Sequence, residues 1–289
     1  MFWNQFKTVL LLSTLSGLLF LFGYWLGGSS GLVFAFIFSL GMNFLTYFFS
    51  DRMVLAMYGA QPLDRTRYSS IYKMMEELCY NAQLPMPKLW YIDTPMANAF
   101  ATGRNPKHAS VAVTQGILDI LEEHELRGVL AHEISHVKNR DILVGTVAAT
   151  IATVISYLAN MARWSLIFGG SGRDDRDRSR SGVGTFVAAI IVPFAAMLIQ
   201  FAISRSREYL ADESGAKCSH DPLALASALE KLDQSTKAHV EEAPTAAHAS
   251  AASLFIVYPF TAQGLMNLFS THPPMEKRIA RLRKMAGVK

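Results

Sequence analysis

The sequence predicts an α+β protein that is mainly helical, with a small β-sheet and four transmembrane helices. Two observations lead to this prediction. Long stretches of the chain carry no charged residue, and the polar segments between them combine helical periodicity with short extended patterns. Hydrophobic residues make up 51% of the chain and charged residues only 17%, against about 25% in a typical soluble protein. This composition argues against intrinsic disorder and is too apolar for an ordinary soluble enzyme.

The first long apolar stretch predicts a membrane hairpin. Residues 8–50 contain no acidic, basic or histidine side chain. One spanning helix needs about 20 apolar residues, so this run holds two spans, with a break at the Gly- and Ser-rich residues 27–31. A cleaved signal peptide would have a shorter apolar region and a small-residue cleavage site, so we expect an uncleaved hairpin. The alternative is a long hairpin buried in a soluble core.

Two further uncharged runs, residues 142–162 and 181–204, are each long enough to span a membrane. Pro193 should kink the second of them, which neighbouring helices can tolerate in a bilayer. Lys7 precedes the first hairpin and Arg52 follows it, whereas the connecting turn is uncharged, so both ends of that hairpin should face the cytoplasm. The loop at 163–182 conflicts with this orientation, because its arginines, counted alone, would place it in the cytoplasm too.

The polar segments predict the remaining elements in order. Residues 64–80 have the periodicity of a helix, 88–93 of a strand, and 98–102 and 110–114 of two strands joined by a turn. A long helix should run from about 122 to 137, with a possible continuation into the third span. Asp221 and Pro222 predict the start of a helix reaching about 232, residues 235–252 a mobile loop, and residues 275–285 a basic terminal helix.

Residues 132–136 read His-Glu-Ile-Ser-His. On a helix His132 and His136 lie one turn apart on the same face, so both imidazoles can reach one metal ion. Glu133 lies beside them, where it can take a proton from a water molecule bound to that metal ion. The helical context of the motif makes a chance occurrence on a surface helix improbable.

A catalytic zinc ion usually has three protein ligands, so this pair needs a third. Metzincins supply another His just downstream, but residues 139–141 lack that pattern. Glu208 is the best candidate, because Glu208 and Asp212 share one helical face. One of these carboxylates can bind the metal while the other hydrogen-bonds a ligand histidine. Such a pair is weak evidence alone, since solvated helices carry similar pairs.

A shared metal also constrains the topology. The His pair precedes the third span and Glu208 follows the fourth, so both must lie on the same side of the membrane. The third and fourth spans then form a hairpin, or do not fully cross. We favour export of the loop at 163–182, because Asp174, Asp175 and Asp177 lower its net charge.

Four motifs, in order, carry a resemblance to a known family. They are Asn-Ala-Phe-Ala-Thr-Gly at 98–103, Ala-His-Glu-Ile-Ser-His-Val-Lys-Asn at 131–139, Ser-Arg-Ser-Arg-Glu-Tyr-Leu-Ala-Asp at 204–212 and Thr-His-Pro-Pro at 271–274. Interleaved with the apolar runs, they make the chain resemble the HtpX-type membrane zinc metalloproteases, which are gluzincins related to the CAAX prenyl proteases. The resemblance covers nearly the whole chain, although residues 173–180 and 236–252 match no motif.

The resemblance implies a zincin-like catalytic domain on a membrane anchor. Residues 1–50 would form the N-terminal transmembrane hairpin, 51–141 the first part of the catalytic domain with the zinc helix, 142–204 the second hairpin, and 205–289 the second part with the third ligand. One zinc ion per chain is expected. The location implied is the bacterial inner membrane, with several spans and the catalytic domain in the cytoplasm.

The resemblance also implies roles for individual residues. His132, His136 and Glu208 would be the zinc ligands, Glu133 the catalytic base, and Asp212 the partner of a ligand histidine. His272 is our choice for stabilising the oxyanion, the alternative being an ordinary loop histidine. The strand that begins Asn98, Ala99, Phe100, Ala101 could pair with an extended substrate, the alternative being a plain buried strand.

The expected activity is zinc-dependent endopeptidase cleavage, by attack of a metal-activated water with Glu as the base. The family acts in stress response and quality control, so the expected substrates are misfolded or damaged proteins, above all membrane proteins. The other expected partner is the lipid bilayer. Nucleic acid is not expected, because the basic residues are dispersed. Two alternatives remain: a peptidase for one defined substrate, such as a prenylated C-terminus, and a non-enzymatic membrane protein.

Overall fold

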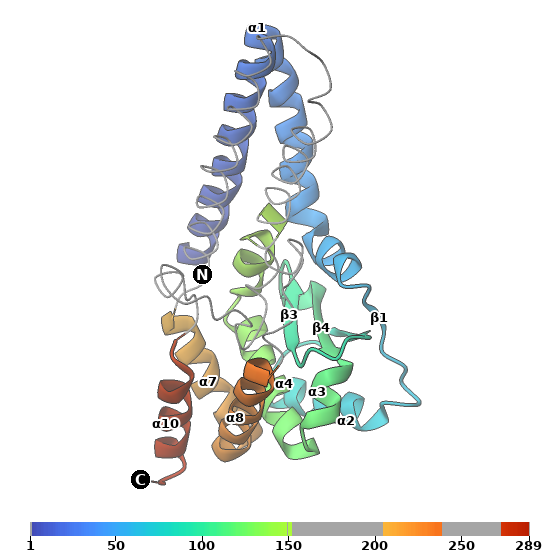
Figure 1. The fold of residues 1–289 in the computed structure, drawn as a ribbon, viewed down its shortest axis with the longest axis vertical. Coiled ribbons are helices and arrows are strands. Elements are labelled where there is room, and N and C mark those ends of the chain that lie inside the picture. Colours follow the sequence, from blue (N-terminus) through green and yellow to red (C-terminus); the bar gives the residue numbers. More distant parts are fainter. Residues whose placement is uncertain (1, 149, 152–204, 239–272, 289) are drawn as a thin grey trace.

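The computed structural model describes residues 2–148, 150–151, 205–238 and 273–288. A helical hairpin rises from a compact domain that contains the sheet and the remaining helices (Figure 1). The hairpin is α1, Phe2–Met57, which reverses direction near Gly28, a residue with a φ of 56°. Gly23 and Gly31 let the two limbs touch there, since a Cβ atom on Gly31 would lie 2.0 Å from the carbonyl oxygen of Gly23.

Two segments of α1 are long and apolar enough to cross a membrane, namely Asn4–Leu21 and Gly28–Met57. Only 22% and 17% of the residues of these segments are buried within the protein. Most of their apolar surface is therefore available to contact lipid. Of the expected third span, residues 142–148 and 150–151 are described; they are helical, and Val144, Val147 and Ile151 pack with Leu11 and Leu15 of α1. The rest of that span, the fourth span, the loop at 163–182 and most of the loop at 235–252 lie outside the described residues.

The domain contains a four-stranded mixed sheet in the order β1-β2-β4-β3. The strands are β1 Gln61–Pro62, β2 Lys88–Ile92, β3 Ala99–Gly103 and β4 Ala109–Thr114. β2 and β4 run parallel, whereas β1 and β3 pair antiparallel with their neighbours. β3 therefore forms one edge of the sheet. The strands expected at 88–93, 98–102 and 110–114 are confirmed to within one residue at each end.

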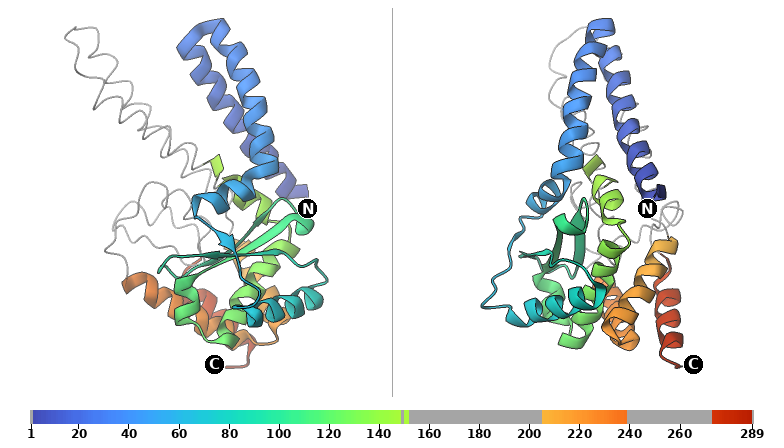
Figure 2. Two further views of the ribbon diagram at one scale, coloured as in Figure 1. Left: turned by 90° about the vertical axis from the view of Figure 1, so that its right-hand side faces the viewer. Right: turned by 180° about the vertical axis from the view of Figure 1, so that it is seen from behind.

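The two faces of the sheet bury different partners, as alternation along a strand requires. Val111 and Val113 of β4 belong to the main helical core. Ala112 between them packs in a second cluster with Val54 and Leu55, near the end of α1. The last turn of α1 thus packs on one face of the sheet, and the helices of the domain pack on the other (Figure 2).

The helices of the domain are α2 Ser69–Ala82, η1 Pro106–His108, α3 Gln115–Ile120, α4 Glu123–Lys138, α7 Arg205–Ser219, α8 Pro222–Ala238 and α10 Met275–Met285. α2 begins later than expected, because Asp64 accepts hydrogen bonds from the amides of Thr66 and Arg67 and so holds a turn instead. α8 continues past the expected end at 232. Its last turn gains an ion pair between Asp233 and Lys237, four residues apart.

The possible continuation of α4 into the third span is wrong. The helix ends at Lys138, and Arg140 takes the left-handed conformation with a φ of 56°. A new helix begins at residue 142. The break brings Asp141 back toward the last turn of α4, where its carboxylate reaches His136.

Candidate metal centre

The candidate centre is built on α4. Its first turn carries a capping box in which the side chain of Glu122 and that of Glu125 satisfy each other's backbone amides. One turn of helix separates His132 from His136 and brings their Nε2 atoms to 3.2 Å from each other. His132 is buried, whereas His136 is partly accessible.

Glu208 on α7 completes the cluster. Its Oε2 lies 3.8 Å from Nε2 of His132, and its Oε1 lies 3.7 Å from Nε2 of His136. One possible ligand atom from each of the three residues falls within 4.8 Å of the others. The structure thus brings Glu208 of α7 to the two histidines of α4, although at least 72 positions of the sequence separate them.

Close packing of α7 on α4 makes this convergence possible. Gly215 of α7 faces the backbone of α4, and a Cβ atom there would lie only 2.8 Å from the backbone nitrogen of His132. Gly128 performs the same role one turn earlier on α4, where a Cβ atom would lie 2.9 Å from the backbone nitrogen of Leu225 on α8. Both positions require glycine because the helix backbones themselves are in contact.

Each histidine has a carboxylate at its other ring nitrogen. Oδ1 of Asp212 lies 3.0 Å from Nδ1 of His132. Both carboxylate oxygens of Asp141 lie 3.2 Å from Nδ1 of His136. Carboxylates in this position fix the tautomer and orientation of a ligand histidine.

Arg278 of α10 supports this arrangement from behind. The residue is completely buried, and its Nε and Nη2 atoms donate to the two carboxylate oxygens of Asp212 at 2.8 and 2.7 Å. Its Nη1 atom lies 3.7 Å from Oε2 of Glu208. One guanidinium therefore contacts both acidic residues of α7 that face the centre.

The electrostatics favour a cation at this point. Burial would lower the pKa of His136, but the carboxylates of Asp141, Glu208 and Glu133 raise it to about 10. Burial raises the pKa of Glu133 above its ordinary value. Burial would also raise the pKa of Asp212, but Arg278 and His132 outweigh it and lower that pKa to about 2. The protein alone thus places a concentration of negative charge around the two imidazoles.

The geometry fits zinc. Ligand atoms about 2.0–2.1 Å from a tetrahedral ion lie roughly 3.3–3.4 Å apart. The observed separations of 3.2, 3.7 and 3.8 Å are close to that edge length. Two imidazoles and one carboxylate form a donor set that zinc takes in catalytic sites, with a fourth position left for water.

Glu133 lies between this centre and the edge of the sheet. It is 4% exposed, and its Oε2 accepts a hydrogen bond of 2.8 Å from the backbone amide of Ala101 in β3. Its Oε1 has no hydrogen-bond partner among the residues that the structure describes. One oxygen therefore positions the side chain, and the other can exchange a proton.

The residues predicted to bind substrate, in and just before β3, make contacts on both faces of the sheet. The backbone of Asn98 is joined to Thr114, whose hydroxyl receives the Asn98 amide and donates to its carbonyl. Ala99 and Ala101 face the helical core, whereas Phe100 packs on the opposite face against Tyr58 of the loop after α1. His272 lies outside the described residues, which resume at Pro273 just before α10.

Asp141 and Arg278 were not predicted from the sequence. Arg278 was detectable in principle, because it lies three residues after Met275 and four before Leu282, on the apolar stripe of α10. A charged residue on such a stripe is rarely buried without a partner. Asp141 carries no comparable signal.

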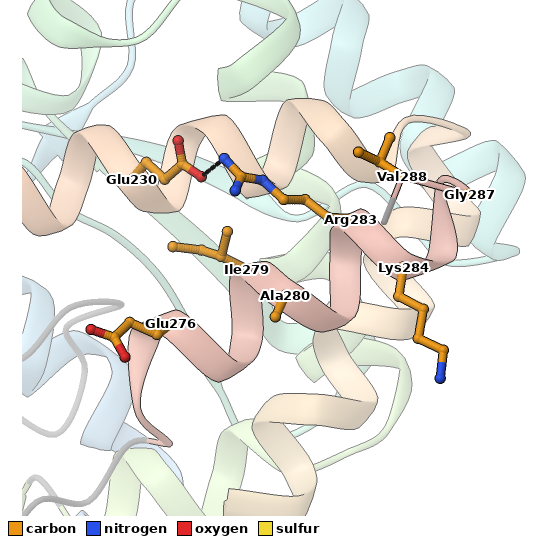
Figure 3. Close-up of a pocket in the computed structure, with 8 residues that line it drawn as sticks. All are labelled: Glu230, Glu276, Ile279, Ala280, Arg283, Lys284, Gly287 and Val288. Carbon is orange, nitrogen blue, oxygen red and sulfur yellow. Dashed lines mark hydrogen bonds and ion pairs between the residues drawn. The ribbon is translucent and has the colours of Figure 1, made fainter.

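A surface hollow between α8 and α10, where Arg283 donates to Glu230 at 2.6 Å, includes none of the centre's residues (Figure 3).

Comparison with known proteins gives one family. The model of peptidase family M48 matches residues 66–286. A protein named Protease HtpX homolog from Syntrophobacter fumaroxidans is 52% identical over 286 residues, which cover 98% of this chain and 99% of that protein. A second of the same name, from Ralstonia pickettii, is 50% identical over 283 residues, covering 98% and 97% of the two chains.

The fold is similar to a solved structure with much lower sequence identity. The crystal structure of S. mikatae Ste24p superposes with a TM-score of 0.51 and 18% identity. The match covers 96% of this chain but only 65% of the longer Ste24p chain. At this identity the likeness concerns the fold alone.

Proposed function

This chain belongs to peptidase family M48 and is a protease, and we propose that it is a zinc-dependent endopeptidase of the bacterial inner membrane. Its substrates are misfolded or damaged proteins, chiefly membrane proteins, and it acts in quality control under stress. Its catalytic domain faces the cytoplasm. The full-length relatedness to proteins named as HtpX proteases supports the activity, and the two apolar limbs of α1 support the location.

One observation carries the proposal. Nε2 of His132, Nε2 of His136 and the carboxylate of Glu208 converge within 4.8 Å, and the buried Glu133 neighbours His132 on the same helix. Zinc ligands and a general base in this arrangement are the parts that metal-assisted peptide hydrolysis requires.

Zinc, when bound by these three residues, lowers the pKa of water toward about 7 and polarises the scissile carbonyl. Oε1 of Glu133 takes the proton of the attacking water and later gives it to the leaving amine. The raised pKa of Glu133 suits this exchange, because a base is most effective when its pKa approaches the working pH. Asp212 and Asp141 hold the two imidazoles in orientation.

We assign substrate binding to the edge of β3 that faces away from β4, at Ala99, because the amides of Ala101 and Gly103 on this edge already donate to Glu133 and Thr146. The amide of Ala101 points away from β4, since it donates to Glu133. Ala99, two residues earlier, has the same orientation in a regular strand. An extended substrate adding to this edge would be recognised through its backbone, which gives broad specificity. His272, in the Thr-His-Pro-Pro segment before α10, remains our proposal for the oxyanion donor.

The test compares wild type with Glu133→Gln, both purified at full length in detergent. We expect about one zinc ion in each, and cleavage of an unfolded protein such as casein by wild type alone. The loss should be at least about 100-fold, the lower end of what a general base contributes. Glu123→Gln is the matched control, because Glu123 is an exposed glutamate on the same helix, and it should cleave like wild type.

Other outcomes would change the assignment. Zinc without cleavage of casein, but with cleavage of a prenylated peptide, would replace broad specificity by a single defined substrate. Absence of zinc from both proteins would contradict the ligand assignment. Equal cleavage by wild type and Glu133→Gln would contradict the role of the base.

A further inference from the structure

A basic pocket lies where the second limb of α1 meets the sheet. Its volume is about 390 Å³. Four cations line it, from four separate parts of the chain: Arg52 near the end of α1, Lys88 at the start of β2, Arg104 in the turn after β3, and Lys107 in η1. None of the residues named for the metal centre lines this pocket.

The charges of this pocket are unbalanced. Asp51 is the one carboxylate among its lining residues. Within the described part of the chain, none of the four cations forms an ion pair with a carboxylate, and the nearest polar contact of Arg104 is Nε2 of His108 at 3.1 Å. Cations held together in this way repel one another, and an anion between them would relieve that repulsion.

The other wall of the pocket is aromatic and faces outward. Arg104 lies over the ring of Phe48 at 5.1 Å, and Arg52 lies over the ring of Phe49 at 5.5 Å. Phe44 and Phe48 are 56% and 41% exposed, with ring centroids 4.7 Å apart. They belong to the apolar segment Gly28–Met57, whose charge-free part ends just before Asp51. The pocket therefore lies where the apolar surface gives way to charge.

We propose that this pocket binds the phosphate group of an anionic phospholipid. The acyl chains lie along the exposed rings of Phe44 and Phe48, and the phosphate contacts Arg104, Lys107 and Lys88. A soluble anion would use the cations but leave the adjoining apolar surface uncovered. A phospholipid satisfies both, because its charge and its chains meet at the same boundary. Basic residues beside a spanning helix attract anionic lipids in general, and here they converge on one cavity.

The test measures lipid binding by the full-length protein in detergent, using native mass spectrometry. Phosphatidylglycerol and phosphatidylcholine with the same acyl chains are the two probes. We expect wild type to retain one phosphatidylglycerol at least tenfold more tightly than phosphatidylcholine. Arg104→Gln/Lys107→Gln should lose this preference. Lys73→Gln/Lys277→Gln is the matched control, because it removes the same charge from exposed lysines outside the pocket, and it should keep the preference.

Further arms make the result decisive. Inorganic phosphate at millimolar concentration should not displace the lipid, and full displacement would identify a site for a soluble anion and overturn the proposal. Equal retention of both lipids by wild type, or an unchanged preference in Arg104→Gln/Lys107→Gln, would also overturn it. If the double variant unfolds at a lower temperature, two single changes at the exposed Lys107 replace it. Lys107→Gln should weaken phosphatidylglycerol binding, whereas Lys107→Arg, which keeps the charge, should bind like wild type.

Discussion

At the scale of single residues, the candidate ligands depend on partners that never touch the metal position. Asp212 contacts Nδ1 of His132, and Asp141 contacts Nδ1 of His136. In both histidines this is the ring nitrogen that faces away from the metal position. Arg278 in turn holds Asp212 with two hydrogen bonds and contacts Glu208 at 3.7 Å. The orientation of the site is thus set partly by α10, although no proposed ligand lies on that helix.

Replacing Asp212 should therefore weaken metal binding without removing a ligand. We expect Asp212→Asn to lower zinc affinity about 10–100-fold, the range found when the partner of a ligand histidine is lost. Competition with a chromogenic chelator measures this directly. Glu213→Gln, at a partly exposed position on the same helix that pairs with Lys217, should leave the affinity unchanged. Equal affinities for Asp212→Asn and wild type would mean that Asp212 serves only the packing of Arg278.

Glu125 predicts a dependence of stability on pH that is separate from the metal centre. Burial would raise the pKa of its carboxyl, but hydrogen bonds from Lys231, Ser227 and the amide of Glu122 outweigh burial and lower it. Because the folded pKa lies below the unfolded one, the stabilisation is complete above the unfolded pKa. It is lost as the pH falls through the folded pKa.

We expect Glu125→Gln to cost about 1 kcal/mol of unfolding free energy at neutral pH, since the ion pair with Lys231 becomes a hydrogen bond from the ammonium to an uncharged amide. Thermal unfolding of both proteins in detergent across an acidic pH series measures the difference. The gap between them should shrink as the pH falls through the folded pKa. A gap independent of pH would show that the charge of Glu125 contributes nothing.

At the scale of elements, the distance between α4 and α7 sets the geometry of the centre. Gly215 lies against the backbone of His132 and is seven residues, about two turns, beyond Glu208 on the same helix. Any side chain at this position must push the two helices apart. The displacement would move Glu208 away from the histidine pair.

Gly215→Ala should therefore reduce both stability and zinc retention, despite the better helix propensity of Ala. We expect a loss of about 1–3 kcal/mol, as for other overpacked cores, together with weaker zinc binding. Gly41→Ala in α1 is the comparison, because no described atom lies within 4 Å of a Cβ atom there. An unchanged zinc affinity in Gly215→Ala would contradict the idea that this contact positions Glu208.

The elements that sequence analysis predicted well are those with strong local signals. The terminal helix has its expected bounds, and β2, β3 and β4 lie within one residue of theirs, because periodicity and turn residues mark them. Contacts between distant segments were beyond it. The place of β3 at the sheet edge agrees with the expectation that this strand could pair with an extended substrate. The bond from Arg278 to Asp212, 66 positions apart, leaves no pattern in neighbouring residues.

The metal candidates show the same division. His132 and His136 are a local motif, so their shared helix face could be predicted from spacing alone. Glu208 required the chemical argument that two ligands are too few. Asp141 was not predicted, because its contact with His136 depends on the end of α4 at Lys138, and the sequence pattern is compatible with a longer helix.

At the scale of the whole molecule, a metal ion would join two halves of the catalytic domain. α4 and α7 are separated in sequence by residues 139–204, and each supplies part of the ligand set. An ion bound only by the folded protein stabilises it by mass action, by about 2.7 kcal/mol when its concentration is 100 times its dissociation constant. Removal of zinc should consequently affect the domain as a unit and not the site alone.

We expect a chelator to lower the Tm of the wild-type protein by roughly 5–10 °C, at about 2–4 °C for each kcal/mol lost in a domain of this size. Added zinc should restore the Tm and the protease activity together. His136→Ala provides the control, because a protein that has lost a ligand should already unfold at the lower temperature and respond little to the chelator. If wild type and His136→Ala respond alike, the stabilising ion is bound elsewhere. A wild-type Tm that does not change on complete removal of zinc would mean that packing of α7 on α4, through Gly215, holds the two halves together without help from the metal.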